Sequence, residues 1–567
     1  MKTKFLVVVG IIICLVIAAG AYFHVTSIMD SLFVYRSPLH NDPPTPGKAL
    51  GQPLTARVVF VLIDALRDDT SHKTAVMPFL NELRGKGAWA TMHSRMPSFS
   101  DPGWTTLMTG AWPDINDGPA LNTDYEDTPA WTQDNIFNAA HRAGLKTAFS
   151  GYYWWEKLVP HESVDIYFPT AGEDQIADQE VVKASLPWIK SGEYQFILIH
   201  IDQVDYAGHH EGGPRSPNWD AAATRSDKIL KEITSYLDLT KDTLIIVSDH
   251  GQIDQGGHGG PEAINMIEPI VMVGAGVKPG EYPDIQQVDV APTISALLGL
   301  NIPATAQGLV LTDMLSLTNG QFANIEGTLL TQKMQLENAY LKAIGASTEI
   351  KPSNSVSEIL TFMDAARAKR FKAERLPRIG WMILLALFPA TILFLKRNKT
   401  IAWLAGGAVI YVIVFNFRYA ILANRTYSLS SITSANDMII FTGLTAVLAV
   451  FIAWLVTSIG LHSFKVSVSQ AAGQTLGFVF FTLYVLALPI MWSYGLNGGA
   501  SGWTLPEMVS RFLEVLYTLQ GMVVALVGVI LTGVTMLVAA MILKKNTKPE
   551  IIKEEVLDAV EPPTEGL

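Results

Sequence analysis

The chain has 567 residues, which is too many for a single compact hydrophobic core. Hydrophobic residues make up 49% of it and charged residues only 16%, a balance that a wholly soluble protein rarely shows. The formal net charge of −11 disfavours a nucleic acid as a binding partner. Because the single cysteine, Cys14, lies in an apolar run, the sequence offers no internal disulfide and no thiolate metal site. Any metal must be held by carboxylates, imidazoles and hydroxyls.

The N-terminal part of the sequence predicts a membrane anchor. A short basic start, residues 1–4, precedes an apolar run over residues 5–25. The run is long enough to span a bilayer and has no convincing small-residue cleavage site, so we interpret it as an uncleaved signal anchor. The basic start places the N-terminus in the cytoplasm. Residues 26–55 are rich in Pro, Gly and Asn and are predicted to form a linker.

The C-terminal part predicts five further membrane helices between residues 379 and 543. The apolar runs are 380–395, 401–423, 438–461, 475–492 and 522–543. Six spans in all return the C-terminus to the cytoplasm and make the protein multi-pass, with the domain between the first and second spans on the extracytoplasmic side. The spans contain almost no ionisable residues, which argues against an ion-coupled transporter. We expect the charged tail, residues 544–567, to be disordered.

Between the membrane segments, residues 56–315 alternate between short apolar runs and amphipathic stretches. The predicted strands are 57–63, 145–152, 194–201, 243–248 and 268–273, and the clearest helices are 77–86, 132–143 and 218–237. This pattern predicts an α/β fold with a mostly parallel sheet sandwiched by helices, beside the α-helical transmembrane bundle. In such sheets the chemistry lies beyond the carboxyl ends of the strands. Residues 316–378 are polar and predict a helical stalk.

Polar motifs follow several of the predicted strands. The side chains that they bring are Asp64, Ser100, Asp205, His209, Asp249, His250 and His258. Taken singly, each motif has an ordinary structural role, such as a helix cap, a turn or a flexible glycine loop. Together they place three Asp, three His and one hydroxyl on one edge of one sheet. This inventory suits two divalent cations, with Zn2+ favoured over Mn2+ because imidazole and carboxylate are mixed.

Ser100 is the predicted nucleophile. Pro102 suits the first position of a helix, which would make Asp101 or Ser100 the cap of that helix. A hydroxyl at a helix N-terminus lies where a developing alkoxide and a bound phosphate are both stabilised.

Neighbouring residues leave alternatives open. Asp202 is an alternative to Asp205, although only Asp205 precedes His209 by four residues. His210 is an alternative to His209, and Ser98 is an alternative nucleophile farther from the helix start. The aromatic residues 152–155 follow a strand and either wall a substrate cleft or pack in the core. Further carboxylates in this region are interpreted as solvated turn residues: Asp68, Asp69 and Asp254.

In order and spacing, these motifs resemble the alkaline phosphatase superfamily, specifically its type I phosphodiesterase and nucleotide pyrophosphatase branch, over about residues 57–315. The resemblance implies one metal held by Asp64, Ser100, Asp249 and His250, and another held by Asp205, His209 and His258.

Two residues depart from the pattern of the family. Trp104 stands where a His is common, and Gly103 stands where nucleotide-cleaving members tend to have an Asn, so nucleotide specificity is not implied. The membrane layout is similar to that of the glycolipid ethanolamine phosphate transferases, which usually have more C-terminal spans.

The sequence therefore predicts a membrane-anchored, two-metal phosphodiesterase or phosphotransferase that acts on the extracytoplasmic face through a covalent phosphoseryl intermediate. The alternative enzyme transfers phosphoethanolamine, or a similar headgroup, to a lipid-linked glycan. The alternative from another class is a membrane binding or structural protein with a relic site. The substrate is expected to be a phosphodiester, lipid- or glycan-linked, and the sequence leaves the oligomeric state open.

Overall fold

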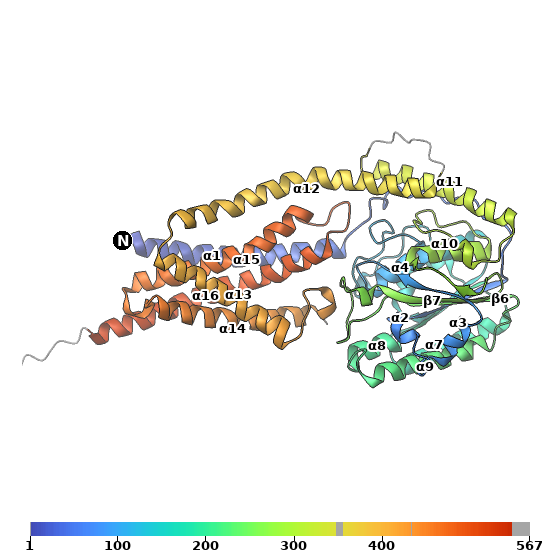
Figure 1. The fold of residues 1–567 in the computed structure, drawn as a ribbon, viewed down its shortest axis with the longest axis horizontal. Coiled ribbons are helices and arrows are strands. Elements are labelled where there is room, and N and C mark those ends of the chain that lie inside the picture. Colours follow the sequence, from blue (N-terminus) through green and yellow to red (C-terminus); the bar gives the residue numbers. More distant parts are fainter. Residues whose placement is uncertain (1, 347–354, 433, 547–567) are drawn as a thin grey trace, which may run out of the picture.

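The computed structural model describes residues 2–346, 355–432 and 434–546, and along its length it consists of a bundle of long helices followed by an α/β domain (Figure 1). Both ends of the described chain lie in the bundle, and the α/β domain is inserted between its first and second helices.

A nine-stranded sheet forms the centre of the α/β domain, in the order β4-β3-β5-β1-β6-β7-β2-β8, with β9 paired to β2. The strands are β1 Arg57–Ile63, β2 Ala88–His93, β3 Thr147–Tyr152, β4 Ile166–Thr170, β5 Phe196–Ile201, β6 Asp242–Val247, β7 Ile267–Gly274, β8 Gly280–Glu281 and β9 Ile285–Gln286. The five strands from β4 to β6 run parallel, whereas β7 is antiparallel to both of its neighbours. The predicted α/β class with a mostly parallel sheet is confirmed, and the reversal at β7 is an addition to it.

Helices cover both faces of this sheet because the central strands are apolar on both sides (Figure 1). Along β1, Phe60 packs in the same cluster as Trp104 of α4, while Val59 and Val61 pack with Trp219 of α9. The covering helices are α2 Asp68–Ser71, α3 Pro78–Arg84, α4 Ser100–Thr109, α5 Ile136–Arg142, α6 Trp154–Leu158, α7 Gln175–Ser191, α8 Gln203–His210, α9 Pro217–Thr234 and α10 Val290–Leu298. The alternation along β1 follows from the two-residue period of a strand.

Six helices in the described chain are long and apolar enough to cross a membrane, so the chain is an integral membrane protein. They are α1 Lys2–Phe33, α12 Val356–Leu395, α13 Lys399–Asn416, α14 Ala435–Gly460, α15 Val468–Asn497 and α16 Met508–Asn546. A further helix, α11 Asn319–Ala343, lies along the α/β domain (Figure 1). The predicted tail beyond residue 546 lies outside the described residues.

The long helices extend beyond the apolar runs from which they were predicted. Helix α1 continues past residue 25 to Phe33, and α12 joins the predicted stalk to the first C-terminal span in 40 residues. At 1.5 Å per residue such a helix rises about 60 Å, roughly twice the hydrocarbon thickness of a bilayer. One end of it must therefore stand outside the membrane, beside the α/β domain.

The early start of α16 adds two ionisable residues to the helix that contains the predicted run 522–543. Arg511 and Glu514 lie in its first two turns, 1% and 0% exposed, and their side chains pair at 2.8 Å. The same carboxylate lies 2.9 Å from His24 Nε2 of α1. Both residues lie outside the predicted run, because residues 508–521 are too polar to register as part of it, although they continue its helix.

Candidate metal centre

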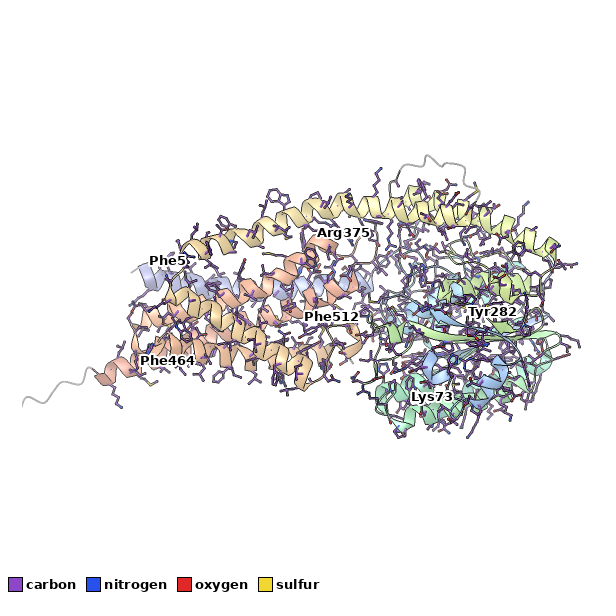
Figure 2. The ribbon with its side chains drawn as sticks, in the orientation of Figure 1. Phe5, Lys73, Tyr282, Arg375, Phe464 and Phe512 are labelled. Carbon is purple, nitrogen blue, oxygen red and sulfur yellow. The ribbon has the colours of Figure 1, made fainter. Side chains whose placement is uncertain are left out.

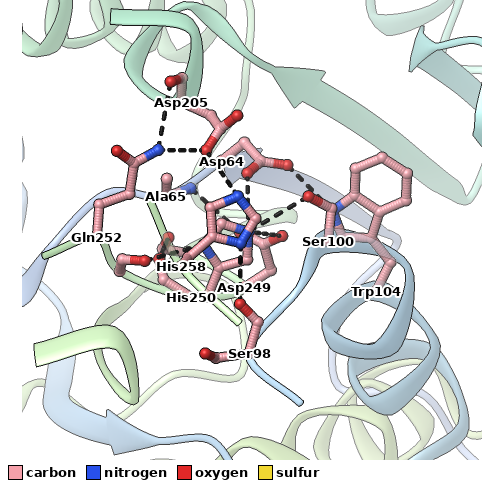
Figure 3. A network of polar contacts seen from close by, with 12 residues as sticks. Asp64, Ala65, Ser98, Ser100, Trp104, Asp205, Asp249, His250, Gln252 and His258 are labelled. Carbon is pink, nitrogen blue, oxygen red and sulfur yellow. Dashed lines mark hydrogen bonds and ion pairs between the residues drawn. The ribbon is translucent and has the colours of Figure 1, made fainter. Parts of the chain in front are cut away.

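Four side chains from three segments meet beyond the carboxyl ends of β1 and β6. Asp64 follows β1, Ser100 begins α4, and Asp249 and His250 follow β6. His250 Nε2 lies 3.3 Å from Ser100 Oγ, 3.4 Å from Asp64 Oδ1 and 3.5 Å from Asp249 Oδ2 (Figure 3). Three oxygens and one imidazole nitrogen therefore converge on one small space.

The chemistry of these four groups fits a divalent cation. Asp64 Oδ1 and Asp249 Oδ2 are buried and have no hydrogen-bond partner in the described structure. Burial, together with the charge of Asp249, raises the pKa of Asp64 well above its usual value, so the ionised form needs a positive charge nearby. His250 Nδ1 lies 3.1 Å from the Gly251 carbonyl oxygen, which only accepts, so this nitrogen carries the proton and Nε2 presents its lone pair to the site.

A second group lies directly beside the first. Asp205 and His209 are one turn apart on α8, and His258 comes from the glycine-rich loop after β6. The two Nε2 atoms of His209 and His258 are 2.9 Å apart, and each lies 3.5 or 3.6 Å from an oxygen of Asp205. His258 Nδ1 donates to the Ser98 carbonyl oxygen at 3.0 Å, which again frees Nε2 as a ligand. The His258 ring stacks on that of His250 at 4.0 Å.

The structure thus brings all seven predicted side chains together. It also shows where the three alternative residues lie: Ser98, His210 and Asp202. Ser98 Oγ donates to the Gly260 carbonyl oxygen and accepts from the amide of Gly259, so it fastens the glycine loop. His210 is exposed and its ring lies against Tyr206. Asp202 does lie close, since its carboxylate forms a further compact group with Asp64 and His200. The roles of the seven as ligands and nucleophile stay predictions.

His200 was missed by the sequence argument, although it touches the site. His200 Nε2 lies 2.9 Å from Asp64 Oδ2, and its Nδ1 accepts from the Tyr152 amide at 3.3 Å. Trp104 Nε1 donates to the same oxygen of Asp64 at 3.2 Å. These two donors occupy Oδ2 and leave Oδ1 facing His250 Nε2, 3.4 Å away. The available signal was a single polar residue in the otherwise apolar strand β5.

Gln252 was missed as well. Its Nε2 donates to Asp205 Oδ1 at 2.5 Å, so it orients that carboxylate between the two histidines. It follows the Asp249-His250-Gly251 motif immediately in sequence, and no motif marks it.

Helix α4 begins two residues earlier than Pro102 suggested. Its first residue is Ser100, its cap position is Phe99, and Phe99 makes no capping hydrogen bond. Asp101 does not cap the helix because its carboxylate accepts from the amide and hydroxyl of Thr123 instead, at 3.3 and 3.4 Å. The expected caps were therefore wrong, while Ser100 keeps its place at the helix N-terminus, where the positive end of the helix dipole favours an anion.

The two departures from the family pattern have local physical reasons. A Cβ at Gly103 would lie 3.1 Å from Asp249 Cβ and from the Asp249 carbonyl oxygen, so the small residue lets α4 approach this loop closely. Trp104 holds Asp64 and stacks on Trp155 at 4.7 Å. Trp155 is fully buried, which assigns a packing role to at least this member of the aromatic run 152–155.

The membrane bundle reaches this site through the loop between α13 and α14, residues 424–432, called here the α13–α14 loop. Ser430 Oγ accepts from the Gly260 amide at 2.9 Å. Glu262 accepts from Ser428 Oγ at 2.5 Å and from Ser430 Oγ at 2.6 Å. The glycine loop that carries His258 is therefore held between the α/β domain and the bundle.

Part of the chain is similar in sequence to known proteins. Residues 58–266 match the family model for type I phosphodiesterase / nucleotide pyrophosphatase. GPI ethanolamine phosphate transferase 2, catalytic subunit, from Homo sapiens is 30% identical over 299 residues, covering 48% of this chain and 30% of the relative. The human GPI ethanolamine phosphate transferase 3, catalytic subunit, is 26% identical over 402 residues, covering 63% of this chain and 36% of the relative. The chain thus spans about a third of the length of these curated relatives.

Solved structures also align with part of the chain. Human ectonucleotide pyrophosphatase / phosphodiesterase 5 aligns with a TM-score of 0.38 and 17% identity, covering 43% of this chain and 95% of the other. The alkaline phosphatase PafA aligns with a TM-score of 0.38 and 12% identity, covering 47% of this chain and 100% of the other.

Proposed function

We propose that this chain, whose residues 58–266 belong to the type I phosphodiesterase / nucleotide pyrophosphatase family within the alkaline phosphatase superfamily, transfers a phosphorylated headgroup through Ser100. The observation that carries this proposal is the position of Ser100 Oγ, 3.3 Å from His250 Nε2. The same nitrogen lies 3.4 and 3.5 Å from two buried carboxylate oxygens, Asp64 Oδ1 and Asp249 Oδ2, which have no hydrogen-bond partner in the described structure. A hydroxyl in this setting is the one that a divalent cation would activate.

Two cations would lower the pKa of the Ser100 hydroxyl and neutralise the negative charge of the phosphate oxygens. The mixture of imidazole and carboxylate ligands favours Zn2+. Asp64, Asp249 and His250 would hold one of them, and Asp205, His209 and His258 the other. In the first step Ser100 Oγ, having lost its proton to solvent, forms a bond to phosphorus. The bond from phosphorus to the departing alcohol breaks, and that alcohol leaves with a proton from water. In the second step the oxygen of an acceptor hydroxyl forms a bond to the same phosphorus and loses its proton to solvent. The bond from phosphorus to Ser100 Oγ breaks, and Ser100 takes a proton from solvent.

The names of the relatives favour transfer of ethanolamine phosphate over hydrolysis. We therefore propose a phosphoethanolamine-type headgroup, a membrane phospholipid as its donor and a lipid-linked glycan as its acceptor. Hydrolysis shares the first step and differs only in water as the acceptor. The positive-inside bias supports an extracytoplasmic position for the α/β domain.

The test is a pair of serine variants assayed with a chromogenic phosphodiester of ethanolamine. We expect Ser100→Ala to lower turnover about a thousandfold or more while most of the bound metal is retained, because the nucleophile is lost and the other six ligands remain. Ser98→Ala should still form a covalent adduct on residue 100, which mass spectrometry of the quenched reaction would identify. Normal turnover by Ser100→Ala would refute this nucleophile.

A further inference from the structure

A hydrophobic groove lies at the end of the bundle that faces the α/β domain. It has a volume of about 220 Å³ and is bounded by α1, α14, α16 and the α13–α14 loop. Met29, Phe33, Met438 and Phe512 are among its lining residues, and all of the lining residues except Arg511 are apolar. Figure 2 shows Phe512 at the end of the bundle next to the α/β domain.

Packing contacts connect the groove to the residue that precedes Ser100. Leu121 of the α/β domain lines it and packs in one cluster with Leu32 of α1 and Met508 of α16. Phe99 packs against this same cluster and immediately precedes Ser100. The Phe99 ring also lies 5.4 Å from that of His258. The wall of the groove is therefore packed against the residue next to the nucleophile.

Arg511 gives the groove one polar group that needs a partner. Its side chain is 2% exposed, and Nη1 donates to Glu514 at 2.8 Å. Its Nε is buried without a hydrogen-bond partner in the part of the chain that the structure describes. A buried donor without an acceptor is costly, so this N–H is suited to an oxygen brought by a ligand.

We propose that this groove holds an acyl chain of the donor glycerophospholipid, with Arg511 Nε donating to the carbonyl oxygen of an acyl ester. The inference rests on the proposed function and names its donor subsite. In a glycerophospholipid only a glycerol separates the phosphate from the acyl chains, so the chain must lie close to Ser100 when the phosphate reaches it. In a lipid-linked glycan the sugars separate the lipid from the reacting hydroxyl, so the lipid of the acceptor has no need of this groove.

The experiment compares two substrates that share one headgroup. One is phosphatidylethanolamine in mixed micelles and the other is the water-soluble chromogenic diester of phosphoethanolamine. Met29→Trp and Met438→Trp fill the groove, and Arg511→Lys keeps a cation near Glu514 but removes the Nε–H donor. We expect each variant to lower kcat/KM for the phospholipid about tenfold and to leave turnover of the soluble diester within about twofold. Met541→Trp is the matched control, because Met541 is 63% exposed on the outer surface of the bundle.

Lipid retained by the purified full-length protein gives an independent readout. Native mass spectrometry should find about one glycerophospholipid per wild-type chain, and the groove variants should lose it. An unselective mixture of annular lipid that the substitutions do not change would overturn the inference, as would unchanged phospholipid turnover in all three variants. Equal loss of both substrates in a variant that still binds lipid would also overturn it. If the wild type cleaves neither substrate, the proposed function fails. The lipid measurement would still show whether the groove binds a glycerophospholipid.

Discussion

At the scale of single residues, His200 determines how Asp64 faces the site. Both residues are buried, and burial lowers the pKa of His200 to about 3, so the imidazole is neutral. With Nδ1 accepting from the Tyr152 amide, the proton sits on Nε2 and is donated to Asp64 Oδ2. A neutral donor fixes the carboxylate without supplying the positive charge that Asp64 needs. That charge is left for the proposed cation to provide.

We expect His200→Ala to weaken divalent metal binding about 10- to 100-fold, because Asp64 loses the group that orients it. Competition with a fluorescent chelator measures this affinity directly and independently of turnover. His141→Ala removes an exposed histidine from the end of α5 and should leave the affinity unchanged. Wild-type affinity in His200→Ala would show that Asp64 is held well enough by Trp104 alone.

At the scale of elements, the glycine loop after β6 depends on two supports. Ser98 holds it from the side of the α/β domain, and the α13–α14 loop holds it from the side of the bundle. The fit is close: Gly259 has φ +99°, and a Cβ there would lie 2.2 Å from the Phe99 ring. The loop has little conformational freedom while both supports are in place, so the position of His258 depends on a membrane segment as well as on the sheet.

We expect the double variant Ser428→Ala, Ser430→Ala to loosen this loop. Glu262 loses two hydrogen bonds from hydroxyl groups, each worth about 1.5–3 kcal/mol when one partner is charged. Hydrogen exchange over residues 256–262 should become faster, and the more weakly held of two bound cations should dissociate more readily. Ser467→Ala, which removes the exposed serine at the start of α15, should change neither measurement. Unaltered exchange in the double variant would mean that Ser98 suffices.

The sequence predicted the sheet edge well because strands that are buried on both faces are continuous apolar runs, as in β1 and β5. It did not indicate β2 or β4, whose burial alternates or is only partial, so neither forms such a run. Motif residues were predictable because Gly and His interrupt the apolar pattern. Gln252 and the α13–α14 loop were not, because their roles exist only once segments distant in the chain have packed together.

At the scale of the whole molecule, the catalytic domain is attached to the bundle at both of its ends. Helix α1 precedes it, and the 40-residue helix α12 follows it (Figure 1). Arg367 of α12 pairs with Asp114 of the α/β domain at 2.6 Å. With the proposed orientation, α12 runs from the extracytoplasmic domain through the membrane to the basic loop at residues 396–399.

Cysteine labelling in intact cells tests this orientation. The natural Cys14 is 0% exposed, so its background reactivity should be low. Lys183→Cys, at an exposed position of α7, should react with a membrane-impermeant maleimide. Lys399→Cys, exposed at the start of α13, should react only after the cells are permeabilised. The reverse pattern would place the catalytic domain in the cytoplasm.

The contact between Glu262 and Ser428 joins residues 166 positions apart, and this separation has a consequence for biogenesis. A ribosome adding about 5–20 residues per second needs on the order of 10 to 30 s to cover that interval. During this time a nascent chain can complete its sheet while the segment that braces His258 has not yet been made. Maturation of the centre is therefore expected to wait for insertion of the later helices, which would leave a half-translated chain with an unfinished centre.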